Sequence, residues 1–175
     1  MKPLVIKHRR NIWKIAFILV ILGSLVSFAI YNQSHQSTSI LSGITKRPLT
    51  FSLFWPSTQS QITPYKQSIK YDPTNKLITY NAKTASGAHL IITEQETPTS
   101  FNDIPQVYTQ LLLSMSQYSS FDSQSGTVYL THPKELNGGQ AAVMNSKGTL
   151  IFIKPDKPMT DDNWHVLFNN LKIVN

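Results

Sequence analysis

Residues 12–31 form one continuous apolar run, which constrains this chain more than any other feature. No charged residue occurs between Ile15 and Tyr31. A helix of twenty residues is about 30 Å long, the hydrocarbon thickness of a bilayer. Trp13 and Tyr31 are residue types that favour the two membrane interfaces. We therefore predict a transmembrane helix over residues 12–31, acting as a signal anchor.

The distribution of positive charge sets the expected orientation. The basic residues at the start of the chain are Lys2, Lys7, Arg9, Arg10 and Lys14, and the next one is Lys46. Positively charged flanks stay in the cytoplasm. We therefore expect a cytoplasmic basic tail (residues 1–11), a single pass through the plasma membrane, and an extracellular C-terminal part.

A cleavable signal peptide is the alternative interpretation of the same run. Its charged region would be residues 1–14, its apolar region residues 15–26, and its cleavage site Ser27-Phe28-Ala29. The long charged region and the apolar residues that continue through Ile30 favour an uncleaved anchor. Cleavage would instead give a secreted domain. The chain has no cysteine, which excludes a lipoprotein anchor, disulfide bonds and thiolate metal sites.

Small residues mark one stripe of the predicted membrane helix. Gly23 and Ser27 are four residues apart, and Ala16 lies on much the same face seven residues earlier. Small residues at this spacing let two helices approach closely. We expect Ala16, Gly23 and Ser27 to be able to support a weak homodimer through the membrane helix.

Charge outside the membrane run excludes a nucleic-acid surface. Residues 32–175 contain 11 basic and 9 acidic residues, so their net charge is only 11 − 9 = +2. They contain no basic run.

Residues 32–47 begin with a stretch rich in Ser, Gln and Thr, which is typical of a flexible stalk. Residues 48–175 are long enough for one hydrophobic core.

Short apolar segments separated by turn residues predict an α+β domain over residues 48–175. Strands are expected at 51–55, 68–71, 76–81, 88–94, 127–131, 140–145 and 149–154. Asn102 and Asp103 would cap one helix, with Pro105 in its first turn, and Thr160 would cap a last helix containing Trp164. The short connections between strands favour a mainly antiparallel sheet, with both helices packed on one face.

The sequence contains no recognisable catalytic pattern. The chain lacks G-x-S-x-G, S-x-x-K, H-E-x-x-H and Gly-rich phosphate motifs. Glu94 and Glu96 are spaced to share one strand face, but a solvated strand end is the favoured interpretation. His89, His132 and His165 are far apart in the sequence, and His165 is expected to be exposed. We predict no catalytic, cofactor-binding or metal-binding residue.

Aromatic residues are dense near the start of the outer domain. Six lie within thirty residues: Phe51, Phe54, Trp55, Tyr65, Tyr71 and Tyr80. Exposed aromatic rings bind sugars and peptides, but a domain without disulfides also needs such rings in its core. The core interpretation is favoured.

Several strand segments resemble those of uncharacterised single-pass, membrane-anchored bacterial ectodomain proteins. They are F-S-L-F-W-P (51–56), L-I-T-Y (77–80), L-I-I-T-E-Q (90–95) and G-T-L-I-F-I (148–153). The resemblance implies a fold pattern and no activity. We expect a non-enzymatic extracytoplasmic domain that binds an envelope protein or a cell-wall polymer. An exported hydrolase or wall-modifying enzyme is the alternative.

Overall fold

The computed structural model describes residues 49–133, 137 and 139–174, all within the second of two compact units, residues 36–175. The predicted tail (1–11), membrane helix (12–31) and stalk (32–47) therefore lie outside the described residues, as do Ala16, Gly23 and Ser27. In the part of the chain that is described, no helix has the length and apolar character needed to cross a membrane.

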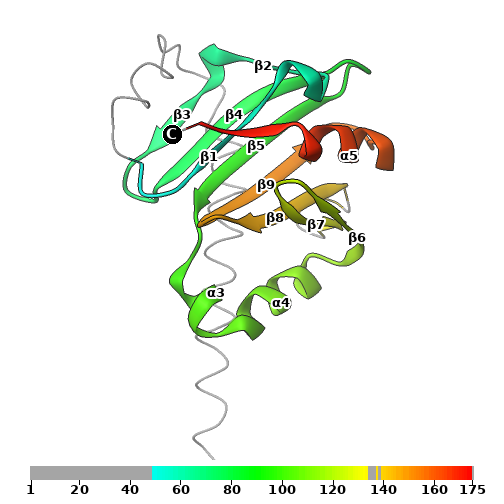
Figure 1. Ribbon diagram of the computed structural model, residues 1–175. Coiled ribbons are helices and arrows are strands. Elements are labelled where there is room, and N and C mark those ends of the chain that lie inside the picture. Colours follow the sequence, from blue (N-terminus) through cyan, green and yellow to red (C-terminus); the bar gives the residue numbers. More distant parts are fainter. Residues whose placement is uncertain (1–48, 134–136, 138, 175) are drawn as a thin grey trace, which may run out of the picture. The chain divides into compact units, whose positions relative to one another are not determined.

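The described domain is α+β, as predicted, with a mainly antiparallel sheet (Figure 1). Its strands are β1 (Leu53–Pro56), β2 (Ile62–Pro64), β3 (Lys70–Asp72), β4 (Leu77–Thr84), β5 (His89–Glu96), β6 (Gln117–Ser123), β7 (Gly126–Thr131), β8 (Ala141–Ser146), β9 (Thr149–Pro155) and β10 (Leu171–Val174). Its helices are α3 (Thr99–Asp103), α4 (Pro105–Ser114) and α5 (Asp161–Asn169), with short 3-10 turns η1 (Thr58–Ser60) and η2 (Lys66–Ser68).

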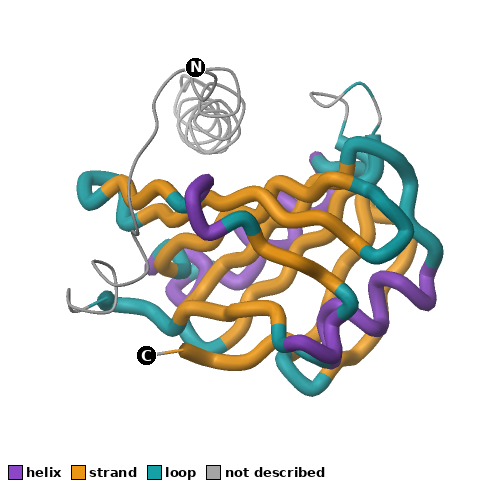
Figure 2. The backbone as a smooth tube through the Cα atoms, turned by 90° about the horizontal axis from the view of Figure 1, so that it is seen from above, coloured by secondary structure: helices purple, strands orange, loops and turns teal. Residues whose placement is uncertain are grey.

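Most strands belong to one large sheet, in the order β2-β4-β5-β9-β8-β7-β6. Strand β3 also pairs with β4, beside its first residues, whereas β2 pairs with the last residues of β4. Every pairing in this sheet is antiparallel. Strands β1 and β10 form a separate antiparallel pair, so the two ends of the described domain run side by side (Figure 2).

The hairpin formed by β3 and β4 confirms the turn predicted from Asp72-Pro73-Thr74-Asn75. One Asp72 carboxylate oxygen accepts the backbone N–H groups of Thr74 (2.9 Å) and Asn75 (3.2 Å). Lys76 completes the turn with a φ of 49°. Asp favours turns because its carboxylate can accept backbone N–H groups just after it in the chain, and Asp72 stabilises this turn in that way.

The main core lies on one face of the sheet, beneath α5 and the β1–β10 pair (Figure 1). Helix α5 begins as predicted, because the Thr160 hydroxyl accepts the N–H of Asn163 at 3.3 Å. Its apolar stripe is fully buried against the strands, through Trp164, Leu167 and Phe168. These side chains meet alternate residues of the strands, including Tyr80, Ile92, Val128 and Ile153.

The prediction that both helices cover one face is wrong. The Tyr108 ring of α4 packs edge-on against Tyr129 of β7, at 5.9 Å, whereas Val128 and Leu130 belong to the core beneath α5. Neighbouring residues of a strand point to opposite faces. Helices α3 and α4 therefore cover the face opposite to α5 (Figure 1).

The start of the first helical region also differs from the prediction. Asn102 and Asp103 belong to the short helix α3, and Ile104 occupies the cap position of α4 without a side-chain hydrogen bond. Pro105 is at the start of α4, as expected. Pro105 has no N–H to satisfy and its φ suits a first helical residue, so α4 can begin without a polar cap.

Trp164 offers a test of the core. Its side chain is fully buried, and its indole N–H has no hydrogen-bond partner among the described residues. We expect Trp164→Ala to lower the free energy of unfolding by about 3–5 kcal/mol, because it leaves a large cavity. Trp164→Phe should cost less, since it also removes a buried, unpartnered donor. Thermal and urea unfolding of the full chain would measure both. An unchanged melting temperature for Trp164→Ala would contradict the core described here.

Candidate functional site

An open groove of about 720 Å³ lies between the end of β1 and the β2 side of the sheet. It is lined by Trp55, Pro56, Ser57, Thr58, Gln61, Ile62, Thr63, Pro64, Tyr65, Lys66, Lys83, Thr84 and Ala85. We call it the Trp55 groove. These residues come from β1, η1, β2, the start of η2 and the end of β4.

Hydrogen bonds hold the two loops that form the groove walls in place. The Ser60 hydroxyl donates to the Ser57 carbonyl at 2.6 Å, and the Gln61 carbonyl accepts the N–H of Ala85 at 2.9 Å. Across the groove, the Ser68 hydroxyl donates to the Tyr65 carbonyl at 2.6 Å and accepts the N–H of Asn81 at 2.8 Å. The walls are therefore held to the sheet before any ligand arrives.

The groove presents two aromatic rings that are only partly buried. Trp55 packs against Tyr80, with ring centroids 4.7 Å apart, and Tyr65 lies at the start of η2. Phe51, Phe54 and Tyr80 are buried, as the core interpretation of the aromatic segment predicted. Trp55 and Tyr71 are partly buried and pack against this core, whereas Tyr65 departs from the prediction. Trp55 and Tyr65 both line the groove.

The charge of the groove lining is positive over the described residues. Lys66 and Lys83 are both exposed, and no acidic residue occurs among the lining residues that the structure describes. Lys172 is exposed as well, and it pairs with Trp55 in the β1–β10 register. Polar side chains of Ser57, Thr58 and Gln61 complete the lining. Cations beside partly exposed rings give a surface suited to anionic ligands that also carry apolar faces.

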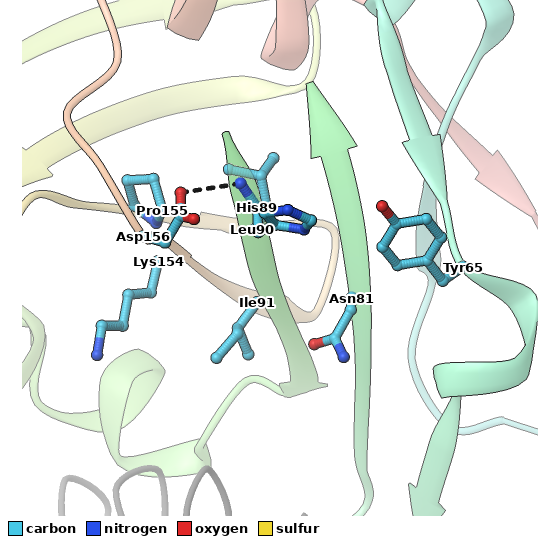
Figure 3. A pocket seen from close by; sticks show the side chains of 8 residues that line it. All are labelled: Tyr65, Asn81, His89, Leu90, Ile91, Lys154, Pro155 and Asp156. Atoms are coloured by element: carbon cyan, nitrogen blue, oxygen red, sulfur yellow. Dashed lines mark hydrogen bonds between the residues drawn. The ribbon is translucent and has the colours of Figure 1, made fainter. Parts of the chain in front are cut away.

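A smaller hollow, of about 350 Å³, shares Tyr65 with this groove (Figure 3). It contains titratable side chains from Tyr65, His89, Lys154 and Asp156. The Asp156 carboxylate accepts the backbone N–H of His89 at 2.9 Å, and the His89 and Tyr65 rings are 6.4 Å apart. No hydrogen bond joins these four side chains to one another in the described part of the chain. The hollow therefore lacks the paired base and nucleophile that acid–base or covalent catalysis uses.

Glu94 is the most unusual titratable residue of the domain. It was expected at a solvated strand end, and this interpretation is wrong, because the side chain is fully buried. One carboxyl oxygen accepts the Phe54 N–H at 2.7 Å, and the other lies 3.2 Å from the Tyr80 hydroxyl. The Tyr80 hydroxyl is also 3.2 Å from the Phe54 carbonyl oxygen. Glu96 is half-buried and forms an ion pair with Lys76.

Burial decides the protonation of this cluster. Loss of hydration raises the pKa of the Glu94 carboxyl to about 8, although the hydrogen bonds from Phe54 and Tyr80 act in the opposite direction. Burial also raises the pKa of Tyr80 well above its usual value, with a further contribution from Glu94. Near pH 7 the carboxyl is therefore mostly neutral. It then donates to Tyr80, which donates to the Phe54 carbonyl, so every polar group is satisfied.

The other two histidines of the described residues take part in ring packing. His132 stacks on Tyr118 at 4.5 Å, and His165 lies 3.9 Å from the Phe121 ring. His165 is half-buried, so the expectation of an exposed position is wrong. Over residues 49–133, 137 and 139–174, no group of three or more His, Asp or Glu residues is arranged to hold a metal ion.

Comparisons with protein-family models, with curated proteins and with solved structures find no match for this chain.

The Glu94 cluster predicts how stability depends on pH. The folded protein holds the Glu94 proton up to a pKa of about 8, whereas the unfolded chain releases it near 4.5. This stabilisation is complete below pH 4.5 and is lost as the pH rises to 8, at up to about 1.4 kcal/mol per pH unit. Urea unfolding of the full chain between pH 5 and 8 should show this slope.

Glu94→Gln should remove the slope, and Glu96→Gln is the matched control. The glutamine keeps a similar shape and hydrogen bonds but does not titrate, although its second amide hydrogen is left buried. Glu96 lies two residues away and is only half-buried, so Glu96→Gln should retain the wild-type slope. Parallel pH profiles for wild type and Glu94→Gln would contradict the neutral carboxyl.

Proposed function

We propose that this protein is a membrane-anchored extracytoplasmic domain that binds an anionic glycan polymer of the cell envelope and has no enzymatic activity. The observation that carries the proposal is the Trp55 groove, in which Trp55 and Tyr65 accompany Lys66 and Lys83, with no acidic residue in the described part of its lining. The anchor comes from the apolar run at residues 12–31.

The two kinds of groove residue match the two chemical features of such a polymer. Aromatic faces pack against the C–H groups of sugar rings, and hydroxyl and amide side chains can bond their hydroxyl groups. Lysines attract carboxylate or phosphate substituents through charge. A preformed groove limits the entropy lost on binding. Because the groove is open, a long polymer can lie along it without threading one of its ends through a closed site.

The enzyme alternative has no comparable support. The hollow next to the groove contains His89, Lys154 and Asp156, but Asp156 bonds a backbone N–H and not the imidazole ring. Glu94 is enclosed in the core and exposes no atom to a substrate. A binding role accounts for the exposed residues of the groove without requiring a catalytic group.

The proposal predicts selective binding to a charged polysaccharide. Full-length protein in detergent micelles should bind polygalacturonate, and bind less tightly both to dextran, which lacks charge, and to polyglutamate, which lacks sugar rings. The double variant Lys66→Gln/Lys83→Gln should weaken binding to polygalacturonate about tenfold, or about 1.4 kcal/mol. Binding should also weaken as salt rises. Isothermal calorimetry or fluorescence titration provides the measurement.

Lys147→Gln is the matched control, because Lys147 is also exposed but lies in the β8–β9 turn. It should bind like the wild type. Trp55→Ala should abolish binding, with a melting curve recorded alongside to establish that the variant is folded. Equal affinity for polygalacturonate and polyglutamate, or equal losses in the Lys147 and Lys66/Lys83 variants, would overturn the proposal.

A further inference from the structure

The two edges of the large sheet differ in how they are protected from pairing with other strands. One edge is divided between β2 and β3, which are three residues each, and β2 ends in Pro64. Short strands and proline block the addition of another strand. The other edge is β6, which spans seven residues and contains neither proline nor lysine.

Strand β6 is also open along its outer side. It pairs with β7 alone among the described strands, and Gln117, Tyr118, Ser119 and Ser120 are all exposed. Its one irregularity is a bulge between Gln117 and Ser119, at the beginning of the strand. The sequence Q-Y-S-S-F-D-S carries one charge, that of Asp122. An edge strand of this length with unpaired backbone groups is a template for another strand.

We propose that β6 pairs with β6 of a second copy of this chain, antiparallel and centred on Ser120. This register is centred on the regular part of the strand, beyond the bulge, and a two-fold axis makes the contact self-complementary. It places Ser119 opposite Phe121 of the second copy, and Tyr118 opposite Asp122. The two Asp122 carboxylates are therefore kept apart, whereas parallel, in-register pairing would bring these like charges side by side.

Asp122 and Tyr118 already have partners that orient them within one chain. Asp122 accepts the Thr127 hydroxyl at 2.8 Å, and the Tyr118 hydroxyl accepts the Gln140 side-chain amide at 2.8 Å. The Tyr118 ring is further held by stacking on His132. The polar side chains near the strand ends are thus positioned before a second copy arrives, and the central residues, Ser119 and Ser120, are small enough for two backbones to approach.

Pairing along one strand buries less surface than a stable dimer in solution requires. Confinement to a membrane raises the effective concentration of the second copy. The contact would therefore be weak for a free domain and populated for the anchored chain. It would place two Trp55 grooves in one assembly, although the pairing itself does not depend on what these grooves bind.

The absence of cysteine from the chain allows a direct test by crosslinking. In antiparallel pairing, opposite Cα atoms are about 4.5–5.5 Å apart, within the range a disulfide bridges. Full-length Ser120→Cys, kept in membranes and oxidised with copper phenanthroline, should form disulfide-linked dimers at least ten times faster than Thr74→Cys. Thr74 is exposed in the β3–β4 turn, so it reports random encounters.

A second variant tests the register. Ser119→Cys would face Phe121 of the second copy and not its own equivalent, so it should crosslink more slowly than Ser120→Cys. Adding Tyr118→Pro to Ser120→Cys should reduce crosslinking to the Thr74→Cys rate, because proline obstructs an edge. Equal rates for Ser120→Cys and Thr74→Cys, such as contact through the membrane helix alone would give, would overturn the proposal.

Discussion

The buried carboxyl of Glu94 is the interaction on which the arrangement of this domain depends. It lies where β1 crosses the sheet, and it connects the backbone of Phe54 to the side chain of Tyr80. An ionised carboxylate in this position would carry an uncompensated charge, because no cation among the described residues is bonded to it. The neutral carboxyl accepts the Phe54 N–H, and Tyr80 donates to the Phe54 carbonyl. Both backbone polar groups of Phe54 are therefore paired. β1 can therefore cross the core with its polar groups paired.

The position of β1 in turn determines the Trp55 groove. Trp55 follows Phe54 directly and packs against the Tyr80 ring, so the cluster that holds β1 also holds the groove's aromatic wall. Strand β10 completes this arrangement by pairing with β1, and the Ser57 N–H donates to the Asn170 carbonyl at 3.0 Å. Binding by the groove, as we propose it, thus rests on a core interaction that never contacts the ligand. The open edge at β6 belongs to the opposite end of the sheet and is independent of this cluster.

Elements with a strong local signal could be predicted from the sequence. The turn at Asp72–Asn75 and the cap at Thr160 each depend on side chains that bond their own backbone neighbours. Strand β6 was missed because its polar sequence shows no apolar alternation, and β10 is too short to give a pattern. The placement of the helices on opposite faces depends on which side chains of β7 lie on each face of the sheet. The sequence of so short a strand does not show which face is which.

The candidate site was only partly accessible from the sequence. The aromatic segment is evident in the sequence, but the separation of buried Phe54 from partly exposed Trp55 depends on the pairing of β1 with β10. Glu94 did carry a usable signal, since strand alternation places it on the same face as Leu90 and Ile92. A glutamate in water is charged at neutral pH, so residue type alone favours a solvated position and conceals that signal. Only the proximity of Tyr80 and the Phe54 backbone explains how a carboxyl is accommodated there.

The protonation of Glu94 tests this account most directly. A carbon-13 NMR titration of the full chain, with Glu94 assigned by comparison with Glu94→Gln, would follow its side-chain carboxyl carbon between pH 4 and 9. The account predicts a midpoint near pH 8, with a neutral carboxyl at pH 6. The Trp55 indole signal should shift with the same midpoint, since its ring packs on Tyr80. A carboxyl that is already ionised at pH 6, with a midpoint near 4.5, would contradict the claim that a neutral Glu94 holds β1 and the groove in place.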